Sequence, residues 1–272
     1  MIGWGLAEVT VRLGATTALD RVSLAVDPGV VAVVVGGDGA GKTTLARTLA
    51  GLVAVYSGTV GRPEGRVGYQ PAGSGVWPDL TVTENLSFVA SAFRIGAAAA
   101  ARRMAALLEA TGLGAARDRL GANLSGGMRR KLGVTMALLS EPEMVVLDEP
   151  TTGVDPVSRY ELWRLVSQTA AAGAAVVMTT TYLDEAERAG TILALEAGRT
   201  LAAGTPEEVR GSLRGAVYAV DRASQADHQW RRGAAWRIWT EGSPPAGARR
   251  VAADLGDVLI AASLAGGGEG SR

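Results

Sequence analysis

The chain has 272 residues, 47% of them hydrophobic, which is enough to bury the core of one large α/β domain with a small appendage. Its 27 basic residues balance its 27 acidic residues, which argues against a strongly basic nucleic-acid-binding protein. Cysteine is absent, so disulfides and cysteine metal sites are excluded. No apolar run approaches the roughly 20 residues that cross a bilayer, and we expect no signal peptide. Work at a membrane would therefore require docking onto another subunit.

The first elements are predicted strands followed by a glycine-rich turn and a helix. Residues 1–29 alternate apolar and polar side chains, as edge strands do. Residues 30–35 form a continuous apolar run, which is typical of a buried parallel strand. After the turn, an amphipathic segment with Leu45 and Leu49 predicts a helix.

The turn itself, residues 36–43 (GGDGAGKT), matches the phosphate-binding pattern G-x-x-x-x-G-K-[ST]. Its glycines let backbone N–H groups face phosphate oxygens, and the helix beginning near Lys42 directs its positive dipole end at the same anion. Lys42 would neutralise the β- and γ-phosphates, and the Thr43 hydroxyl would coordinate Mg²⁺. An ordinary glycine turn is disfavoured by the strand–loop–helix context. Asp38 must point away from the phosphates. The predicted ATP-binding residues are Gly36, Gly39, Ala40, Gly41, Lys42, Thr43 and Thr44.

Further helices and strands alternate along the chain. Thr81 and Glu84 have the form of a capping box that opens a helix at about residue 82. More helices are expected over 96–112, from Ser125 to about residue 140, and over 158–172. Buried strands are expected over 144–147, 174–179 and 192–195, and later strands over 217–220 and 236–239. Residues 242–247 predict a loop. Such alternation implies a mostly parallel sheet with helices on its faces.

Two carboxylates end the apolar strand at residues 144–149 (MVVLDE). Asp148 would hold Mg²⁺, directly or through water. Glu149 would face the water that attacks the γ-phosphate, as general base or orienting group. Alone, such a pair is equally typical of a solvated turn. Downstream of a phosphate loop, it predicts the catalytic end of a nucleotide site with Glu149 as the catalytic residue.

Residues 124–128 (LSGGM) resemble the signature motif, usually L-S-G-G-Q, of the ATP-binding cassette (ABC) family. In that family the residues matching Ser125, Gly126 and Gly127 grip the γ-phosphate of ATP bound to the opposite subunit, so that ATP holds a dimer together. A plain capped helix is the alternative interpretation of these three residues. It is disfavoured because the phosphate loop and the acidic strand occur in the same chain.

Other segments extend the resemblance over about residues 5–212. Residues 151–156 (TTGVDP) resemble the D-loop, with Asp155 at its acidic position. Residues 77–86 (WPDLTVTENL) resemble the segment before the helical subdomain of drug-exporter-like members, where the family contacts its membrane subunit. Residues 255–260 faintly resemble a C-terminal motif of the same exporters.

The resemblance implies an α/β P-loop NTPase cassette with a mostly parallel sheet, an antiparallel β edge, a helical subdomain and a small C-terminal α/β appendage. The expected cassette spans 1–213 with its helical subdomain at about 73–142. The accessory region would span 214–265, and a disordered tail 266–272. The implied cofactors are ATP and Mg²⁺. The implied partners are a membrane-spanning permease and a second ABC subunit, with no nucleic acid. The implied location is peripheral, at the cytoplasmic face of the plasma membrane.

Three positions depart from the family pattern. Thr181 occupies the position of the switch histidine, which contacts the γ-phosphate in the family. Ala72 occupies the position of the Q-loop glutamine. Gln70 lies two residues before Ala72, although strand alternation does not guarantee that its side chain reaches the metal. The position of the adenine-stacking aromatic holds Leu13, and the candidate replacements are Trp4 or another aromatic residue.

These departures leave two expectations about turnover. One altered orienting group costs on the order of 10²–10³ in rate, so two predict nucleotide binding and dimerisation with weak hydrolysis beside a competent partner. The alternative is a fully active homodimeric transport ATPase. A third interpretation, a soluble ABC ATPase acting on ribosomes or DNA, is disfavoured because the chain has neither a second cassette nor a coiled-coil insertion. The single histidine, His228, is expected at the surface without a role.

Overall fold

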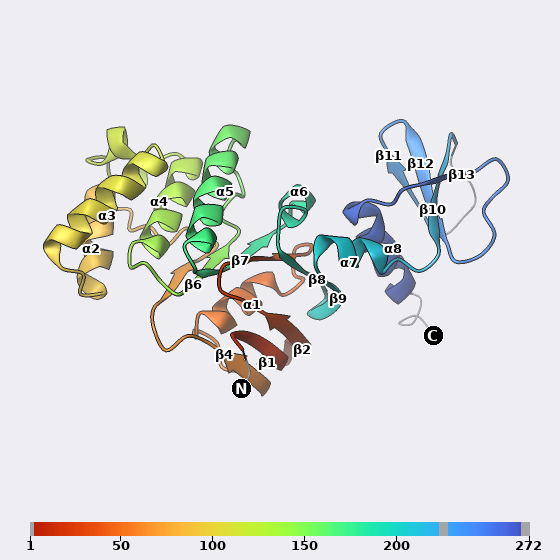
Figure 1. The fold of residues 1–272 in the computed structure, drawn as a ribbon, viewed down its shortest axis with the longest axis horizontal. Coiled ribbons are helices and arrows are strands. Elements are labelled where there is room, and N and C mark those ends of the chain that lie inside the picture. The colour runs from red at the N-terminus through yellow and green to blue at the C-terminus, as the bar shows by residue number, and fades with distance from the viewer. Residues whose placement is uncertain (1–2, 223–227, 268–272) are drawn as a thin grey trace.

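The computed structural model describes residues 3–222 and 228–267. Within these residues the strands form a six-stranded, a three-stranded and a four-stranded sheet. Figure 1 shows a helical group at one end, the six-stranded and three-stranded sheets in the middle, and a small β-rich lobe at the other end. None of the described helices combines the length and apolar character needed to span a bilayer.

The six-stranded sheet is the centre of the molecule. Its strands, in spatial order, are β5 (Val67–Gln70), β6 (Met144–Asp148), β7 (Ala175–Thr180), β3 (Val31–Val35), β8 (Thr191–Glu196) and β9 (Arg199–Gly204). The first five are parallel, and β9 runs antiparallel to β8. The predicted buried strands are confirmed. Parallel strands end at the same edge of a sheet, so the carboxyl ends of β3, β6 and β7 meet there.

Two hydrophobic layers cover the central sheet because successive side chains of a strand point to opposite faces. Val33 of β3 and Leu147 of β6 belong to one layer, which also contains Leu162 of α5 (Pro156–Ala171). Val34 of β3 belongs to the other layer. The fully buried β-branched run therefore has helices or a second sheet on both sides.

The second layer is closed by the N-terminal sheet and α1. This antiparallel sheet has the order β2 (Thr16–Ala25), β1 (Gly5–Leu13), β4 (Ser57–Gly61). Leu45 and Leu49 of α1 (Lys42–Leu49) are fully buried in the layer with Val9 of β1. The expected edge strands and the helix after the glycine turn are both confirmed, and α1 is held between two sheets.

The helical subdomain has its own core. It contains α2 (Val82–Ala92), α3 (Ala97–Ala110), the 3₁₀ turns η1 (Gly114–Ala116) and η2 (Gly121–Asn123), and α4 (Gly126–Leu138). Leu86 of α2 and Leu132 of α4 are fully buried together. The capping box is confirmed: the Thr81 hydroxyl accepts from the Glu84 N–H at 3.1 Å, and the Glu84 carboxylate accepts from the Thr81 N–H at 2.7 Å. The hydrogen bond from the Thr81 N–H, and secondarily one from the Thr81 hydroxyl, lower the pKa of the Glu84 carboxyl group.

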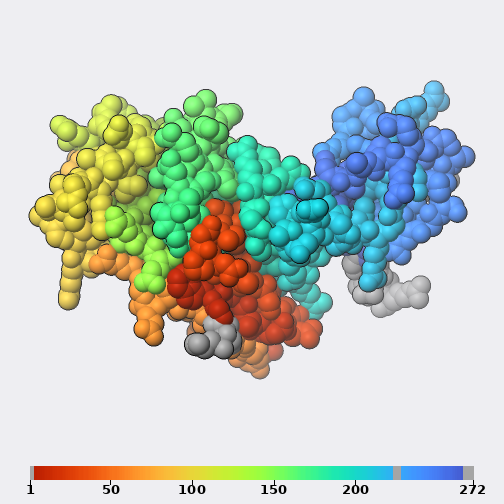
Figure 2. All heavy atoms as spheres, viewed as in Figure 1, coloured from red at the N-terminus to blue at the C-terminus, as the bar shows by residue number. Residues whose placement is uncertain are grey.

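The C-terminal part forms the β-rich lobe and a helix that returns to the cassette. After α6 (Leu183–Ala186) and α7 (Pro206–Gly211), the lobe has the order β11 (Gln229–Arg232), β12 (Ala235–Thr240), β10 (Ala216–Val220), β13 (Arg249–Val251). Figure 2 shows it projecting from the body. The last helix, α8 (Leu255–Gly267), buries Leu255 and Val258 in the same layer as Val209 of α7.

The sequence interpretation of this end was incomplete. It predicted β10 and β12 but assigned no helix to residues 255–260, which form the first turns of α8. The expected tail from residue 266 overlaps the end of α8 at Gly266 and Gly267, and its remainder lies outside the described residues. His228 is exposed as expected, with its ring 5.4 Å from that of Trp239.

Candidate functional site

The predicted phosphate loop connects the end of β3 to the first residue of α1. Gly41 has φ of 103°, and a Cβ there would lie 2.8 Å from the Ala18 carbonyl oxygen, so only glycine fits. The Lys42 ammonium, which is almost fully buried, donates to the carbonyl oxygens of Gly36 at 2.9 Å and Gly37 at 3.0 Å. The charge is therefore held directly beneath the loop.

Asp148 lies at the carboxyl end of β6 with no exposed surface. Its Oδ1 accepts from the hydroxyls of Thr43 at 3.3 Å and Thr179 at 2.7 Å. Its Oδ2 is buried and has no hydrogen-bond partner among the described residues. A buried charged oxygen without a partner is costly, and hard divalent cations prefer such oxygens. Asp148 and Thr43 therefore fit a Mg²⁺ site.

Glu149 follows directly and turns toward the phosphate loop. Its φ of 51° is left-handed, which is uncommon for a residue with a side chain. One carboxylate oxygen lies 3.2 Å from the Lys42 ammonium, and the other accepts from the Thr152 hydroxyl at 3.3 Å. The Glu149 N–H donates to the Thr179 hydroxyl at 3.0 Å. The two charges expected to act on the γ-phosphate thus lie side by side.

Lys42, Thr43 and Glu149 line a cavity of about 480 Å³, whereas Asp148 and the predicted Gly36 are not among its lining residues. It unites the predicted residues Gly39 to Thr44 with Glu149, and Asp38 lines it as an exposed residue. Two parts of the cavity wall were not predicted from the sequence. They are residues 16–18 of β2 and the turn at Ala197 and Gly198 between β8 and β9. Neither carries a motif. The Ala40 carbonyl accepts from the Gly198 N–H at 3.1 Å, which joins this turn to the phosphate loop.

No aromatic side chain of the described residues lines this cavity. Leu13 lies at the end of β1, 51% exposed, and is not among the lining residues. Trp4 is also absent from the lining and packs against the hydrophobic layer around α1. Neither residue therefore provides an aromatic face in the cavity.

Gln70 does not replace the missing Q-loop glutamine in this structure. It is fully buried at the end of β5, and its amide nitrogen donates to the Pro71 carbonyl at 2.8 Å. A Cβ on Gly133 of α4 would lie 3.0 Å from its Cγ, so the side chain packs toward that helix. Ala72 has no polar side chain, and its carbonyl oxygen accepts a hydrogen bond from the Arg130 guanidinium.

Tyr69, the residue before Gln70, faces the opposite side of β5. Burial, and secondarily the carboxylate of Asp148, raise the pKa of its phenol, while Arg47 lowers it. The phenol is therefore a neutral group at physiological pH. No sequence motif pointed to it.

Thr181 follows β7 as an exposed residue and lies outside the nucleotide cavity. It lines a neighbouring crevice of about 350 Å³ together with Gly36 and Gly37 and with Leu259 and Ile260 of α8. The switch position is thus beside the phosphate loop, but its side chain is a short hydroxyl instead of an imidazole.

A buried carboxylate organises the segment after Thr181. Glu185 has no exposed surface and accepts from the hydroxyls of Thr180 at 2.6 Å and Thr151 at 3.1 Å. Arg159 of α5 lies 3.3 Å from Glu185 and 3.0 Å from Asp184. Burial by itself lowers the pKa of Arg159, but the two carboxylates outweigh it and raise that pKa. The cluster ties the end of β7 to the D-loop.

The signature and D-loop residues lie at helix N-termini. Ser125 caps α4, and its hydroxyl accepts from the Met128 N–H at 3.2 Å, with Gly126 and Gly127 in the first turn. Asp155 caps α5 and accepts from the N–H groups of Val157 and Ser158. The Ser158 hydrogen bond is the largest cause of the lowered pKa of Asp155. None of these residues lines the cavity of the same chain.

An exposed aromatic pair lies at the start of the helical subdomain. Trp77 and Phe88 are 41% and 52% exposed, with ring centroids 4.5 Å apart. The loop that carries Trp77 is held by Asn85, which is fully buried. The Asn85 side chain accepts from the Trp77 N–H and donates to the carbonyls of Trp77, Leu80 and Thr81.

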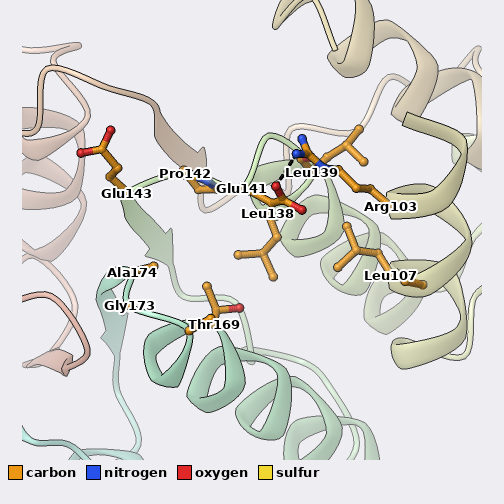
Figure 3. Close-up of a pocket in the computed structure, with 12 residues that line it drawn as sticks. Arg103, Leu107, Leu138, Leu139, Glu141, Pro142, Glu143, Thr169, Gly173 and Ala174 are labelled. Atoms are coloured by element: carbon orange, nitrogen blue, oxygen red, sulfur yellow. Dashed lines mark hydrogen bonds and ion pairs between the residues drawn. The ribbon is translucent and has the colours of Figure 1, made fainter. Parts of the chain in front are cut away.

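A second hollow, of about 600 Å³, lies at the opposite edge of the sheet, where β6 and β7 begin (Figure 3). Leu107, Leu138 and Thr169 contribute to its wall, and an ion pair between Arg103 and Glu141 lies at its side. It contains none of the predicted phosphate or metal residues.

Comparisons with known proteins identify the family of this chain. Residues 19–152 match the family described as ABC transporter. Over 212 residues the chain is 40% identical to the "Probable multidrug ABC transporter ATP-binding protein YbhF" of Escherichia coli (strain K12), covering 74% of this chain and 37% of that protein. Over 208 residues it is 38% identical to "Nod factor export ATP-binding protein I" of Cupriavidus metallidurans (strain ATCC 43123 / DSM 2839 / NBRC 102507 / CH34), covering 72% and 69%. This chain therefore spans little more than a third of the first relative's length.

A solved structure described as "Structure of ATP binding subunit of ABC transporter" is similar with a TM-score of 0.71 and 28% identity, covering 76% of this chain and 91% of that one. The dimeric cassette MJ0796, at 21% identity and a TM-score of 0.67 over 74% of this chain and 97% of that one, supports the fold alone. The expected fold class and the family resemblance are confirmed. The chain belongs to the ABC transporter family and contains its ATP-binding domain.

Proposed function

We propose that this chain is the ATP-binding subunit of an exporter, that it binds ATP with Mg²⁺ and dimerises, and that it hydrolyses ATP slowly. One observation carries this proposal: the groups expected to bind phosphate and metal lie together, whereas the expected orienting side chains are replaced or point elsewhere. Lys42, Thr43, Asp148 and Glu149 converge, but no imidazole from the described residues lines the cavity. The names of the relatives, multidrug transport and Nod factor export, support the exporter assignment.

Binding follows from the charges and donors around the cavity. The N-terminus of α1 and the loop N–H groups would receive the phosphates, and Lys42 would exchange its contact with Glu149 for the β- and γ-phosphates. Thr43 and Asp148 would hold Mg²⁺, which supplies charge neutralisation on the phosphates. Glu149, released from Lys42, would orient and deprotonate the attacking water.

Turnover is expected to be slow because two orienting groups are replaced. Thr181 offers a short neutral hydroxyl from outside the cavity, and Gln70 packs toward α4. Removing one preorganised donor typically costs about 10²–10³ in rate. A subunit of this kind would work best beside a more competent ABC subunit. Its own Ser125, Gly126 and Gly127 would then complete the nucleotide site of that partner.

The partners follow from two surfaces. The signature residues lie outside the chain's own cavity, which supports their use on a second subunit. The exposed Trp77 and Phe88 form an apolar patch of the sort that marks protein contacts, and we assign it to a membrane-spanning permease. Docking there would place the protein peripherally at the cytoplasmic face of the plasma membrane, with no nucleic-acid partner.

Steady-state ATP hydrolysis by the purified protein tests the proposal, with nucleotide binding measured in parallel. We expect ATP binding with little turnover. Glu149→Gln should abolish the remaining turnover, and Thr181→His should restore part of the missing turnover. Turnover equal to that of ordinary transport ATPases, lost in Glu149→Gln, would replace the proposal by a fully active homodimer. Absence of ATP binding would reject both.

A further inference from the structure

One buried hydroxyl joins the two acidic residues of the site. Thr179 of β7 is fully buried and pairs in register with Asp148 of β6. Its hydroxyl donates to Asp148 Oδ1 at 2.7 Å and accepts from the Glu149 N–H at 3.0 Å. A threonine hydroxyl has one proton to donate, and here that proton is committed to the carboxylate. The hydroxyl thus bridges the side chain of one acid and the backbone of the next.

The first contact determines which oxygen of Asp148 is available. Oδ1 receives the hydroxyls of both Thr179 and Thr43, whereas Oδ2 is buried and receives no hydrogen bond from the described residues. A carboxylate held by one oxygen cannot rotate freely about its last bond. Thr179 therefore keeps the free Oδ2 in one orientation, as a preorganised metal ligand requires.

The second contact concerns the backbone of Glu149. Its left-handed φ of 51° costs free energy and persists only where the surroundings hold it. The side-chain bonds of Glu149 to Lys42 and Thr152 lie at its far end. Its backbone is held on one side by a longer bond of 3.4 Å from the Thr152 N–H to its carbonyl, and on the other by the 3.0 Å bond from its own N–H to Thr179. Without it, the carboxylate would lose its fixed direction toward the cavity.

We propose that Thr179 is a positioning residue of the nucleotide site, which orients Asp148 for a divalent cation and holds Glu149 in its strained backbone conformation. This inference rests on the proposed binding of ATP with Mg²⁺ in this cavity. The neighbouring Thr180 has a different task, because its hydroxyl donates to Glu185. Of these two adjacent threonines, only Thr179 bonds to the acidic pair.

The test compares Thr179→Val, which keeps the shape and removes the hydroxyl, with Thr179→Ser, which keeps the hydroxyl. A fluorescent ATP analogue is titrated into each protein with Mg²⁺ and with EDTA. We expect Thr179→Val to retain the affinity measured in EDTA and to lose about tenfold of the gain in affinity that Mg²⁺ provides, the size expected for a lost hydrogen bond to a charged group. Thr179→Ser should remain within about twofold of the wild type.

The matched control is Thr135→Val on α4, another fully buried threonine, whose hydroxyl donates to the Lys131 carbonyl. It should leave the Mg²⁺ gain unchanged. If Thr179→Val does not fold, Thr179→Ala and Thr179→Ser decide in its place. An unchanged gain in affinity from Mg²⁺ in the folded hydroxyl-free variant would overturn this inference and leave the proposed function standing. An equal loss of that gain in Thr179→Ser would do the same. A wild-type protein that binds no nucleotide would overturn both this inference and the proposed function.

Discussion

At the residue scale, Lys42 is shared between the phosphate loop and an acid. Its ammonium contacts two loop carbonyls and the Glu149 carboxylate, so phosphates must compete with Glu149 for it. The pair is largely shielded from solvent, with Lys42 5% and Glu149 21% exposed. The proposed binding and catalysis would therefore be coupled through this ion pair.

This competition predicts the outcome of Glu149→Gln. Removing the carboxylate charge frees Lys42, so ATP affinity should rise by about twofold to fivefold, the range expected for one such ion pair. Turnover should fall by about 10²-fold or more, because the general base is lost. Equilibrium binding and phosphate release measure the two effects, with the exposed Glu187→Gln as control. A lower affinity for ATP would contradict this role of the ion pair.

At the element scale, the loop before α2 shows how one side chain shapes a surface. The capping box at Thr81 and Glu84 starts the helix, and Asn85 in its first turn binds back to the preceding loop. The exposed Trp77 is therefore presented by a buried amide. The sequence could predict the helix start from its pattern, but not the direction of the Asn85 side chain.

The loop gives a stability prediction. Asn85→Ala removes several hydrogen bonds at a fully buried position and leaves the Trp77 N–H without its partner. We expect the free energy of unfolding to fall by about 2–4 kcal/mol. Urea denaturation measures the change as a lower midpoint with an unchanged slope. The control is Ser87→Ala at an exposed position of α2, and a midpoint equal to that control would show that Asn85 does not hold the loop.

At the scale of the whole molecule, α8 connects the β-rich lobe to the cassette. Its Leu255 and Val258 pack in the core layer of the central sheet, while Asp257, with a 1% exposed side chain, faces the lobe. Asp257 accepts from the Trp230 indole at 3.2 Å and from Arg232 at 3.1 Å. The first strand of the lobe begins at Ala216, and the helix that follows the lobe packs into the cassette core.

Breaking this anchor should loosen the lobe and spare the nucleotide site. In Asp257→Ala, the Trp230 indole and Arg232 lose a buried acceptor, so protease cleavage within 214–251 should become several-fold faster. ATP affinity should stay within about twofold of the wild type, since none of the described residues of the lobe lines the cavity. Limited proteolysis with mass spectrometry measures the first effect, against the exposed Glu241→Ala. A large loss of ATP affinity would instead connect the lobe to the site.

The same scales separate what the sequence determined from what the tertiary structure decided. The phosphate loop, the acidic end of β6, the capping box and the buried strands were predictable because each is a contiguous pattern whose chemistry depends on near neighbours. The small C-terminal elements were partly missed because short strands and α8, apolar around most of its surface, lack a clear period.

The remaining features depend on strands that meet only after folding. The cavity wall at residues 16–18 and at Ala197 and Gly198 comes from a separate sheet and from a turn more than 150 residues beyond the phosphate loop. The Thr179 bridge requires the parallel register of β6 and β7, and the fate of Gln70 depends on which face of β5 packs on α4. The sequence by itself predicted which groups would bind phosphate and metal. Strand register and side-chain direction decided which groups orient them, because neither is encoded in a local stretch of chain.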